Sequence, residues 1–192
     1  MAITKVHALS NLAGSTRNAV DYILDPEKTD GKILVSSSHC SAEHAAHEFL
    51  LTQNRHYPKE PYKTSVRSAV HIIQSFSPED PITEETAHEI SCKLAKRIFQ
   101  DNYQYLVSTH IDKKHIHSHI LANAYAINEK KKFHMDGDFY VEVLRKNSDE
   151  LCKEYGLNVI ENEKPDKGKS YKEYSETKKG NSWKEKLKDA LD

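Results

Sequence analysis

A run of histidines between His110 and His119 constrains the fold of this chain more than any other segment. Four of the chain's twelve histidines fall within these ten residues, and from 116 onward His117, His119, Leu121 and Asn123 alternate with Ile116, Ser118, Ile120 and Ala122. Side chains on a β-strand point alternately to its two faces, so this alternation predicts a strand and not a helix. One face of the strand would carry His117 and His119, and the other face would pack on the core.

Strand geometry limits which of these histidines can bind one ion. Neutral histidine is the commonest metal ligand, and imidazole-rich sites suit Zn, Cu, Fe or Ni, or Mn with added oxygen ligands. Residues two apart on a strand lie roughly 6.5–7 Å apart on one face, whereas residues four apart lie roughly 13 Å apart. The pair is therefore His115 with His117 or His117 with His119, and the spacing leaves this choice open. A turn at 112–114 would form a hairpin and bring His110 back beside them.

The composition of this cluster favours a catalytic site over a structural one. Three histidines that leave one position for water are typical of catalytic metal sites, while structural zinc usually recruits cysteines. Cys40, Cys92 and Cys152 all lie far from the run in sequence. A bound divalent ion can polarise a phosphoryl or carbonyl oxygen. The residues alone predict metal-dependent transfer or hydrolysis, with a non-catalytic metal site or a surface histidine group as the alternative.

Length and composition indicate one soluble domain. The chain has 192 residues, of which 30% are charged and 37% are hydrophobic, and its net charge is −1. This charge does not decide whether nucleic acid is a partner. No apolar run approaches the length of a membrane span, and the N-terminus lacks the apolar segment of a secretory signal. With three widely spaced cysteines, which predict reduced thiols, we expect a cytoplasmic protein without membrane insertion.

Helices and strands alternate along the rest of the sequence. We expect strands at 2–9, 32–37, 68–76, 104–110 and 115–125. We expect helices from Ser15 or Thr16 to Leu24, from Ser38 or Ser41 through 45–50, from Thr83 to Gln100, and at 140–155. This order predicts an α+β domain over residues 1–160, with a central antiparallel or mixed sheet and helices packed on it. Residues 161–192 are polar and lysine-rich, and we expect them to lead into an absent C-terminal region.

Three motifs in order carry a resemblance to a known family. They are the segment AVDYILDP with Tyr22, the strand AVHIIQSFSPED with Ser75, and the histidine run that begins at His110 and ends at Asn123. They resemble the three motifs of conjugative relaxases, the mobilisation nucleases of plasmids and integrative elements. The chain looks most like the MobA/MobL (MOBP-class) branch of the HUH endonucleases. The resemblance implies an HUH-endonuclease/relaxase-like two-layer or sandwich architecture.

The resemblance also implies a set of site residues. The family spacing selects His110, His117 and His119 as ligands of one divalent ion, Mn²⁺ or Mg²⁺, and leaves the set with His115 in place of His119 as an alternative. It makes Tyr22 the nucleophile and places Ser75 at the serine of the second motif. Asp112 would orient a histidine or the tyrosine, since ligating imidazoles usually donate their second N–H to such a partner.

The function implied by the resemblance is site- and strand-specific nicking of a transfer origin. Tyr22 would attack a phosphodiester to form a 5′-phosphotyrosyl intermediate, and the strand would later be rejoined. The implied partners are origin DNA, as a duplex with a single strand running to the nick, and accessory relaxosome and coupling proteins. The alternatives are a rolling-circle replication initiator or transposase-type HUH nuclease, and a DNA-binding module without catalysis. The position of the tyrosine before the histidines argues against the first of these.

Overall fold

The structure is a computed structural model that describes residues 2–10, 12–58, 65–135 and 137–159. Its strands are β1 (Ala2–Ser10), β2 (Val35–Ser38), β3 (Arg67–Phe76), β4 (Tyr103–His110) and β5 (His117–Ala126). Its helices are η1 (Leu12–Thr16), α1 (Arg17–Ile23), α2 (Ala45–His56), α3 (Glu84–Phe99), η2 (Phe139–Arg145) and α4 (Lys146–Glu154). The expected extension at 161–192 lies outside the described residues. Within the described ranges, no helix is long and apolar enough to cross a membrane.

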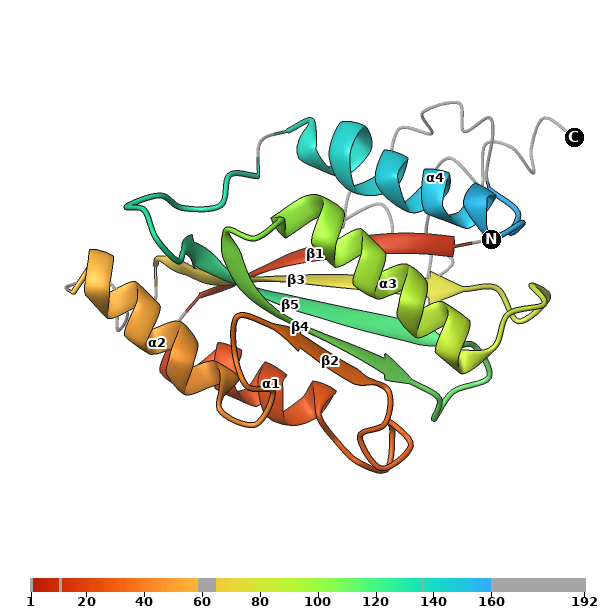
Figure 1. Ribbon diagram of the computed structural model, residues 1–192, viewed down its shortest axis with the longest axis horizontal. Coiled ribbons are helices and arrows are strands. Elements are labelled where there is room, and N and C mark those ends of the chain that lie inside the picture. Colours follow the sequence, from red (N-terminus) through yellow and green to blue (C-terminus); the bar gives the residue numbers. More distant parts are fainter. Residues whose placement is uncertain (1, 11, 59–64, 136, 160–192) are drawn as a thin grey trace, which may run out of the picture. The chain divides into compact units, whose positions relative to one another are not determined.

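The five strands form one antiparallel sheet in the order β1-β3-β5-β4-β2 (Figure 1). β5 lies in the middle of this order, between β3 and β4. The predicted hairpin joins β4 to β5, and its register places His110 opposite His117. The histidine run therefore lies at the turn end of the two central antiparallel strands.

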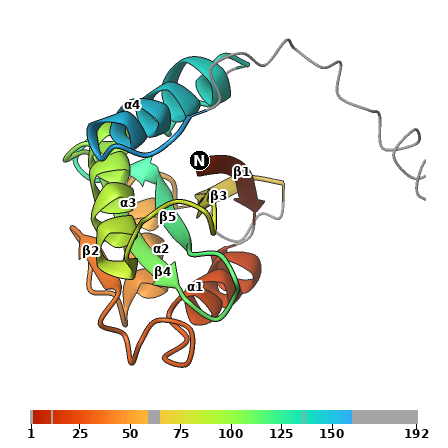
Figure 2. The same ribbon diagram turned by 90° about the vertical axis from the view of Figure 1, so that its right-hand side faces the viewer.

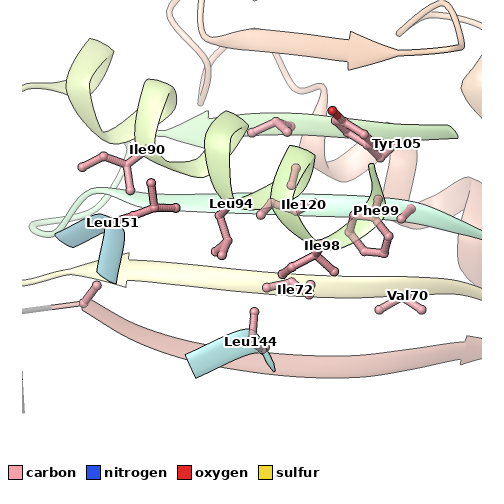
Figure 3. Close-up of a cluster of buried hydrophobic side chains, with 14 of the residues drawn as sticks. Val70, Ile72, Ile90, Leu94, Ile98, Phe99, Tyr105, Ile120, Leu144 and Leu151 are labelled. Atoms are coloured by element: carbon pink, nitrogen blue, oxygen red, sulfur yellow. The ribbon is translucent and has the colours of Figure 1, made fainter. Parts of the chain in front are cut away.

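One face of the sheet packs against α3 and α4. Val70 and Ile72 of β3 and Ile120 of β5 share a buried cluster with Leu94 of α3 and Leu151 of α4 (Figure 3). These strand residues alternate with residues such as His71 and His119 that face the other way, so the strand period selects this face. Complete burial of such aliphatic side chains contributes about 1.5–3 kcal/mol each.

The opposite face carries the histidines and is called the histidine face below. Its apolar residues Ala69, Leu106 and Leu121 share a second buried cluster with Val20 of α1 and Phe49 of α2. Figure 2 shows α3 and α4 on one side of the strands and α1 on the other. Helices therefore cover both faces, and the predicted α+β fold with a central antiparallel sheet is confirmed.

The start of α1 differs from its prediction. The sequence offers Thr16 as an N-terminal cap, but this residue has helical backbone angles and its side chain makes no capping hydrogen bond. The Thr16 side chain is instead buried, with its hydroxyl 2.8 Å from the hydroxyl of Ser68 on β3. A buried hydroxyl needs a partner, and β3 supplies one that the local sequence does not reveal. This contact fastens the start of α1 to the sheet.

Asn123 connects α2 to the sheet on the histidine face. Its side chain is fully buried, and its Oδ1 accepts from Gln53 Nε2 and from the Tyr125 backbone N–H, both at 3.1 Å. Its Nδ2 donates to the Phe49 carbonyl at 3.3 Å and to Gln104 Oε1 at 3.0 Å. The amide is thus occupied by protein partners on both ends, which indicates a structural role for Asn123.

We expect Asn123→Ala to lower the free energy of unfolding by about 2–4 kcal/mol, because several buried polar groups would lose their partner. Urea unfolding followed by circular dichroism measures this loss. Asn18→Ala, at an exposed position of α1, is the matched control and should change the free energy by less than about 0.5 kcal/mol. A variant of unchanged stability would contradict the structural role.

Candidate metal centre

Three histidines of the β4–β5 hairpin meet on the histidine face. The ligand nitrogens of His110, His117 and His119 all lie within 4.8 Å of one another, and all three residues are buried. Over the ranges that the structure describes, this is the group of three or more such side chains that could hold a metal ion. His115 is exposed in the turn before β5 and lies outside this group. The geometry thus groups the set that family spacing selects.

Two nitrogens of this group are buried without a partner. His110 Nδ1 and His119 Nε2 find no hydrogen-bond partner among the described residues. The second ring nitrogen of each is occupied: His110 Nε2 donates to the Ile23 carbonyl at 3.1 Å, and His119 Nδ1 lies 2.9 Å from His71 Nε2. An unpaired buried polar atom costs about 1–3 kcal/mol. Two such lone pairs side by side fit a divalent cation, which would satisfy both.

The third histidine has the same arrangement of its ring. His117 Nδ1 donates to the His115 carbonyl at 3.4 Å. This leaves the lone pair on His117 Nε2 for the centre of the group. Metal-ligating histidines generally donate their second N–H to a protein acceptor, which fixes the tautomer and the ring orientation. All three histidines therefore have the environment of ligands.

Burial keeps these histidines neutral. Loss of solvation, followed by the neighbouring imidazoles, lowers the pKa of His119 to about 2. Burial likewise lowers the pKa values of His110 and His117, and the pKa of His71 falls to about 4 for the same reason. Metal binding requires the neutral imidazole, whose lone pair is the donor. The environment thus supplies imidazole donors without a competing proton.

These pKa values predict a loss of stability in mild acid. An unfolded histidine titrates near 6.5, so below that pH the unfolded chain binds protons that the partly buried His71 and the buried His119 do not. Stability is therefore full above about pH 6.5 and falls as the pH drops toward the folded pKa, about 4 for His71. We expect the metal-free chain to lose more than about 2 kcal/mol of unfolding free energy between pH 7 and pH 4.5.

Urea unfolding at the two pH values measures this loss. His47→Gln, at an exposed position of α2, should leave the difference between them unchanged, because this side chain lies outside the group of buried histidines. Equal stability at pH 7 and pH 4.5 would show that the buried imidazoles do not resist protonation.

Tyr22 lies beside the three histidines, although it is distant from them in sequence. Its ring centroid is 5.5 Å from that of His110 and 5.7 Å from that of His119. The neighbouring Ile23 carbonyl accepts hydrogen bonds from His110 Nε2 and from the Ser108 hydroxyl, both on β4. These two bonds join the end of α1 to β4 and keep Tyr22 next to the imidazoles. Its side chain remains 47% exposed, so a large substrate can reach it.

Lys28 places a cation on the face of the Tyr22 ring. Its Nζ lies 4.1 Å from the ring centroid and 3.0 Å from the Asp25 carboxylate. The hydrogen bond to Asp25 raises the pKa of Lys28. The Lys28 carbonyl also accepts the backbone N–H of Ile111 at 2.9 Å, next to His110. Sequence reasoning missed Lys28, because it follows Asp25-Pro26 in a turn where no periodicity identifies a facing residue.

Ser75 lies on the strand next to the hairpin, and Asp112 lies in the turn of the hairpin. Ser75 is on the histidine face of β3, directly opposite His117 in the register of β3 and β5. Asp112 lies in the turn, where its carboxylate is 3.8 Å from Lys113 Nζ. The charge of Asp112 partly opposes the lowering of the pKa of His110 and of His117 by burial. Both residues are near the centre, and their roles in catalysis stay predictions.

The structure has an antiparallel sheet with three buried histidines beside an accessible tyrosine. This arrangement agrees with the relaxase class that the sequence motifs predict. The family model described as "Relaxase: MobA/VirD2-like, nuclease domain" matches residues 22–157. The chain therefore belongs to the relaxase family, and the resemblance inferred from the three motifs is confirmed.

Named relatives agree with this assignment. The chain is 29% identical over 208 residues to the group II intron-interrupted relaxase LtrB of Lactococcus lactis, a match that covers 91% of this chain and 36% of LtrB. It is 30% identical over 193 residues to a protein rlx of Staphylococcus aureus, covering all of this chain and 53% of that protein. The chain thus spans between about a third and a half of these two curated relatives.

A solved structure supports the fold. It comes from work described as "Molecular Basis of Vancomycin Resistance Transfer in Staphylococcus aureus". The two chains superpose with a TM-score of 0.52 at 12% sequence identity, over 83% of this chain and 96% of the other. At this identity the likeness concerns the fold alone.

Proposed function

We propose that this chain is the nicking domain of a relaxase, which cleaves one strand of a transfer origin with Tyr22 as the nucleophile. The observation that carries the proposal is the position of Tyr22 within 6 Å, between ring centroids, of two buried imidazoles. Each of these imidazoles has a nitrogen without a partner among the described residues. Membership of the relaxase family supports a DNA substrate.

In this proposal His110, His117 and His119 hold one divalent ion, Mn²⁺ or Mg²⁺. When bound, such an ion offsets the negative charge on the oxygens of the scissile phosphate. The chain's own contribution is orientation: the Ile23 and His115 carbonyls accept from His110 and His117 and fix these two imidazole rings. The donor set suits the ion because an imidazole-rich site with free positions for water and phosphate oxygens accommodates Mn²⁺.

The proposed covalent step exchanges one phosphodiester for another. The Tyr22 hydroxyl loses its proton, and its oxygen forms a bond to phosphorus. The bond from phosphorus to the 3′-oxygen breaks, and that oxygen keeps the electron pair and takes up a proton. The products are a 5′-phosphotyrosyl enzyme and a free 3′-hydroxyl, so the reverse attack can rejoin the strand without an external energy source.

Neighbouring residues would support this step without bonding to phosphorus. The ammonium of Lys28, held by Asp25, restrains the Tyr22 ring and adds positive charge where the phosphate approaches. Asp112 lies among the charges that act on His110 and His117 and would help to orient them. Ser75, opposite His117, would lie along the path of the DNA strand.

The remaining predictions for the whole protein belong to this proposal. We infer that residues 1–160 form the nuclease domain and that 161–192 extend it. The predicted partners are origin DNA with a single-stranded segment at the nick, accessory relaxosome proteins and a coupling protein, and the predicted location is the cytoplasm. A replication initiator or transposase-type nuclease, or a DNA-binding module without catalysis, is the alternative.

Covalent capture of DNA tests the proposal and identifies the cleaved sequence in the same experiment. The chain is incubated with Mn²⁺ and a pool of single-stranded oligonucleotides with a randomised centre, and adducts that survive detergent are sequenced. We expect recovery of one consensus sequence with cleavage at a fixed position, and no adduct with EDTA. Capture of the same DNA without covalent linkage would identify the inactive DNA-binding module instead.

A further inference from the structure

We propose that His71 is a positioning residue for the metal centre, acting through His119. This inference rests on the proposed metal site but assigns a role to a residue outside the ligand set. His71 Nε2 lies 2.9 Å from His119 Nδ1, and the two ring centroids are 5.1 Å apart. His119 Nε2, on the other side of the same ring, is buried and has no partner in the described part of the chain.

The tautomers of both rings follow from this geometry. A metal ion takes the lone pair of His119 Nε2, so the proton of that neutral ring must lie on Nδ1. The Nδ1–H then donates to His71 Nε2, which accepts through its own lone pair. His71 consequently carries its proton on Nδ1. The hydrogen bond thus has one direction, from His119 Nδ1–H to His71 Nε2. By accepting it, His71 holds the His119 ring so that the lone pair of Nε2 faces His110 and His117.

The sheet places His71 where it can do this. In the register of β3 and β5, Ile73 lies opposite His119 and His71 lies opposite Leu121. His71 is therefore the diagonal neighbour of His119 on the same face, a separation that ring side chains bridge. A carboxylate, carbonyl or water usually accepts this bond from a ligating histidine, and here the partially buried imidazole of His71 occupies that position.

The structure also provides a matched control on the next strand. His7 of β1 lies opposite His71 in the register of β1 and β3, and its ring centroid is 6.4 Å from that of His71. His7 is exposed and is removed from His119 by the intervening His71. A change at His7 alters the same sheet face without touching the bond to the ligand.

Metal affinity tests the inference directly. Mn²⁺ binding is measured by isothermal titration calorimetry for the wild-type chain and for His71→Phe, His71→Gln and His7→Phe, with circular dichroism as the check of folding. We expect His71→Phe to bind about 10–100-fold more weakly, which is the usual effect of losing such an acceptor. His71→Gln presents an amide oxygen near the position of Nε2 and should restore most of the affinity. His7→Phe should bind like the wild type.

A spectroscopic signature separates positioning from a general structural effect. In the Zn²⁺-loaded wild type, long-range ¹H–¹⁵N spectra should show His119 protonated at Nδ1 and His71 protonated at Nδ1. Unchanged Mn²⁺ affinity in folded His71→Phe, or protonation of His71 at Nε2, would overturn the inference while the proposed metal site stands. Absence of Mn²⁺ binding to the wild-type chain would overturn both. If His71→Phe fails to fold, the comparison of His71→Gln with the wild type and the tautomer measurement still decide.

Discussion

Tyr22→Phe is expected to abolish the covalent DNA adduct, with a loss of at least about 10³-fold in the rate of nicking. Phenylalanine keeps the ring that contacts His110 and His119, and it lacks the oxygen that would bond to phosphorus. Mn²⁺ affinity and thermal stability should therefore remain those of the wild type. The measurement is the amount of detergent-resistant adduct formed with the captured oligonucleotide over time.

The control for this variant is a second accessible tyrosine. Tyr140 is 38% exposed, and its hydroxyl donates to the Thr4 carbonyl at 2.8 Å. Tyr140→Phe should nick DNA at the wild-type rate, because its hydroxyl has a structural partner. Residual adduct formation by Tyr22→Phe, together with a loss of adduct in Tyr140→Phe, would show that the nucleophile is not the tyrosine beside the histidines.

His117→Ala is expected to have the second large effect, on the metal itself. Removal of His117 should disturb the fewest other contacts among the three proposed ligands, since its second nitrogen makes only a long contact to the His115 carbonyl. Removal of His110 or His119 would also disturb Ile23 or His71. Loss of an outer partner alone costs about 10–100-fold in metal affinity, so loss of a ligand should cost more than about 100-fold, with nicking reduced in parallel. Calorimetric titration with Mn²⁺ measures the affinity.

His115→Ala is the matched control and decides between the two ligand sets. His115 is exposed, and the ring centroids of His115 and His117 are 5.3 Å apart, but it lies outside the group formed with His110 and His119. Its substitution should leave Mn²⁺ affinity within a few fold of the wild type. A loss as large as that of His117→Ala would instead favour a centre in which His115 replaces His119.

The fold was largely predictable because the side chains of its strands alternate between two faces of the sheet, and this alternation is visible in the sequence. The alternation around His117 and His119 predicts a strand with one buried apolar face, and the break at 112–114 predicts the hairpin. Both are present in the structure. Helix α3 was predictable from local signals as well, since the Thr83 hydroxyl accepts the Thr86 N–H in a capping bond at 3.2 Å.

Other elements depend on contacts that the local sequence does not contain. The second strand begins at Val35 and not at 32, because residues 30–32 have positive φ angles that interrupt an extended chain. The helix expected at 140–155 begins as the π-helical turn η2 and becomes α-helical only from Lys146. For these two elements the sequence pattern predicts that the element exists, but not the residue at which its regular structure begins.

The candidate site was predictable only in part. Strand spacing reduced the histidines to two possible pairs, and it could not link Tyr22 to them, since that contact depends on the Ile23 carbonyl and His110. The family resemblance supplied Tyr22. The contact of His71 with His119 depends on the register of β3 and β5, which the local sequence does not contain, and Lys28 lies in a turn without a periodic signal.

The most direct test of Tyr22 as the nucleophile is to identify the residue that becomes linked to DNA. The captured adduct is digested with nuclease and protease, and the peptide that retains a nucleotide is sequenced by mass spectrometry. We predict a single 5′-phosphotyrosyl linkage at Tyr22, formed only with a divalent ion present. A linkage at another tyrosine, or cleavage that leaves no nucleotide on the protein, would contradict this mechanism.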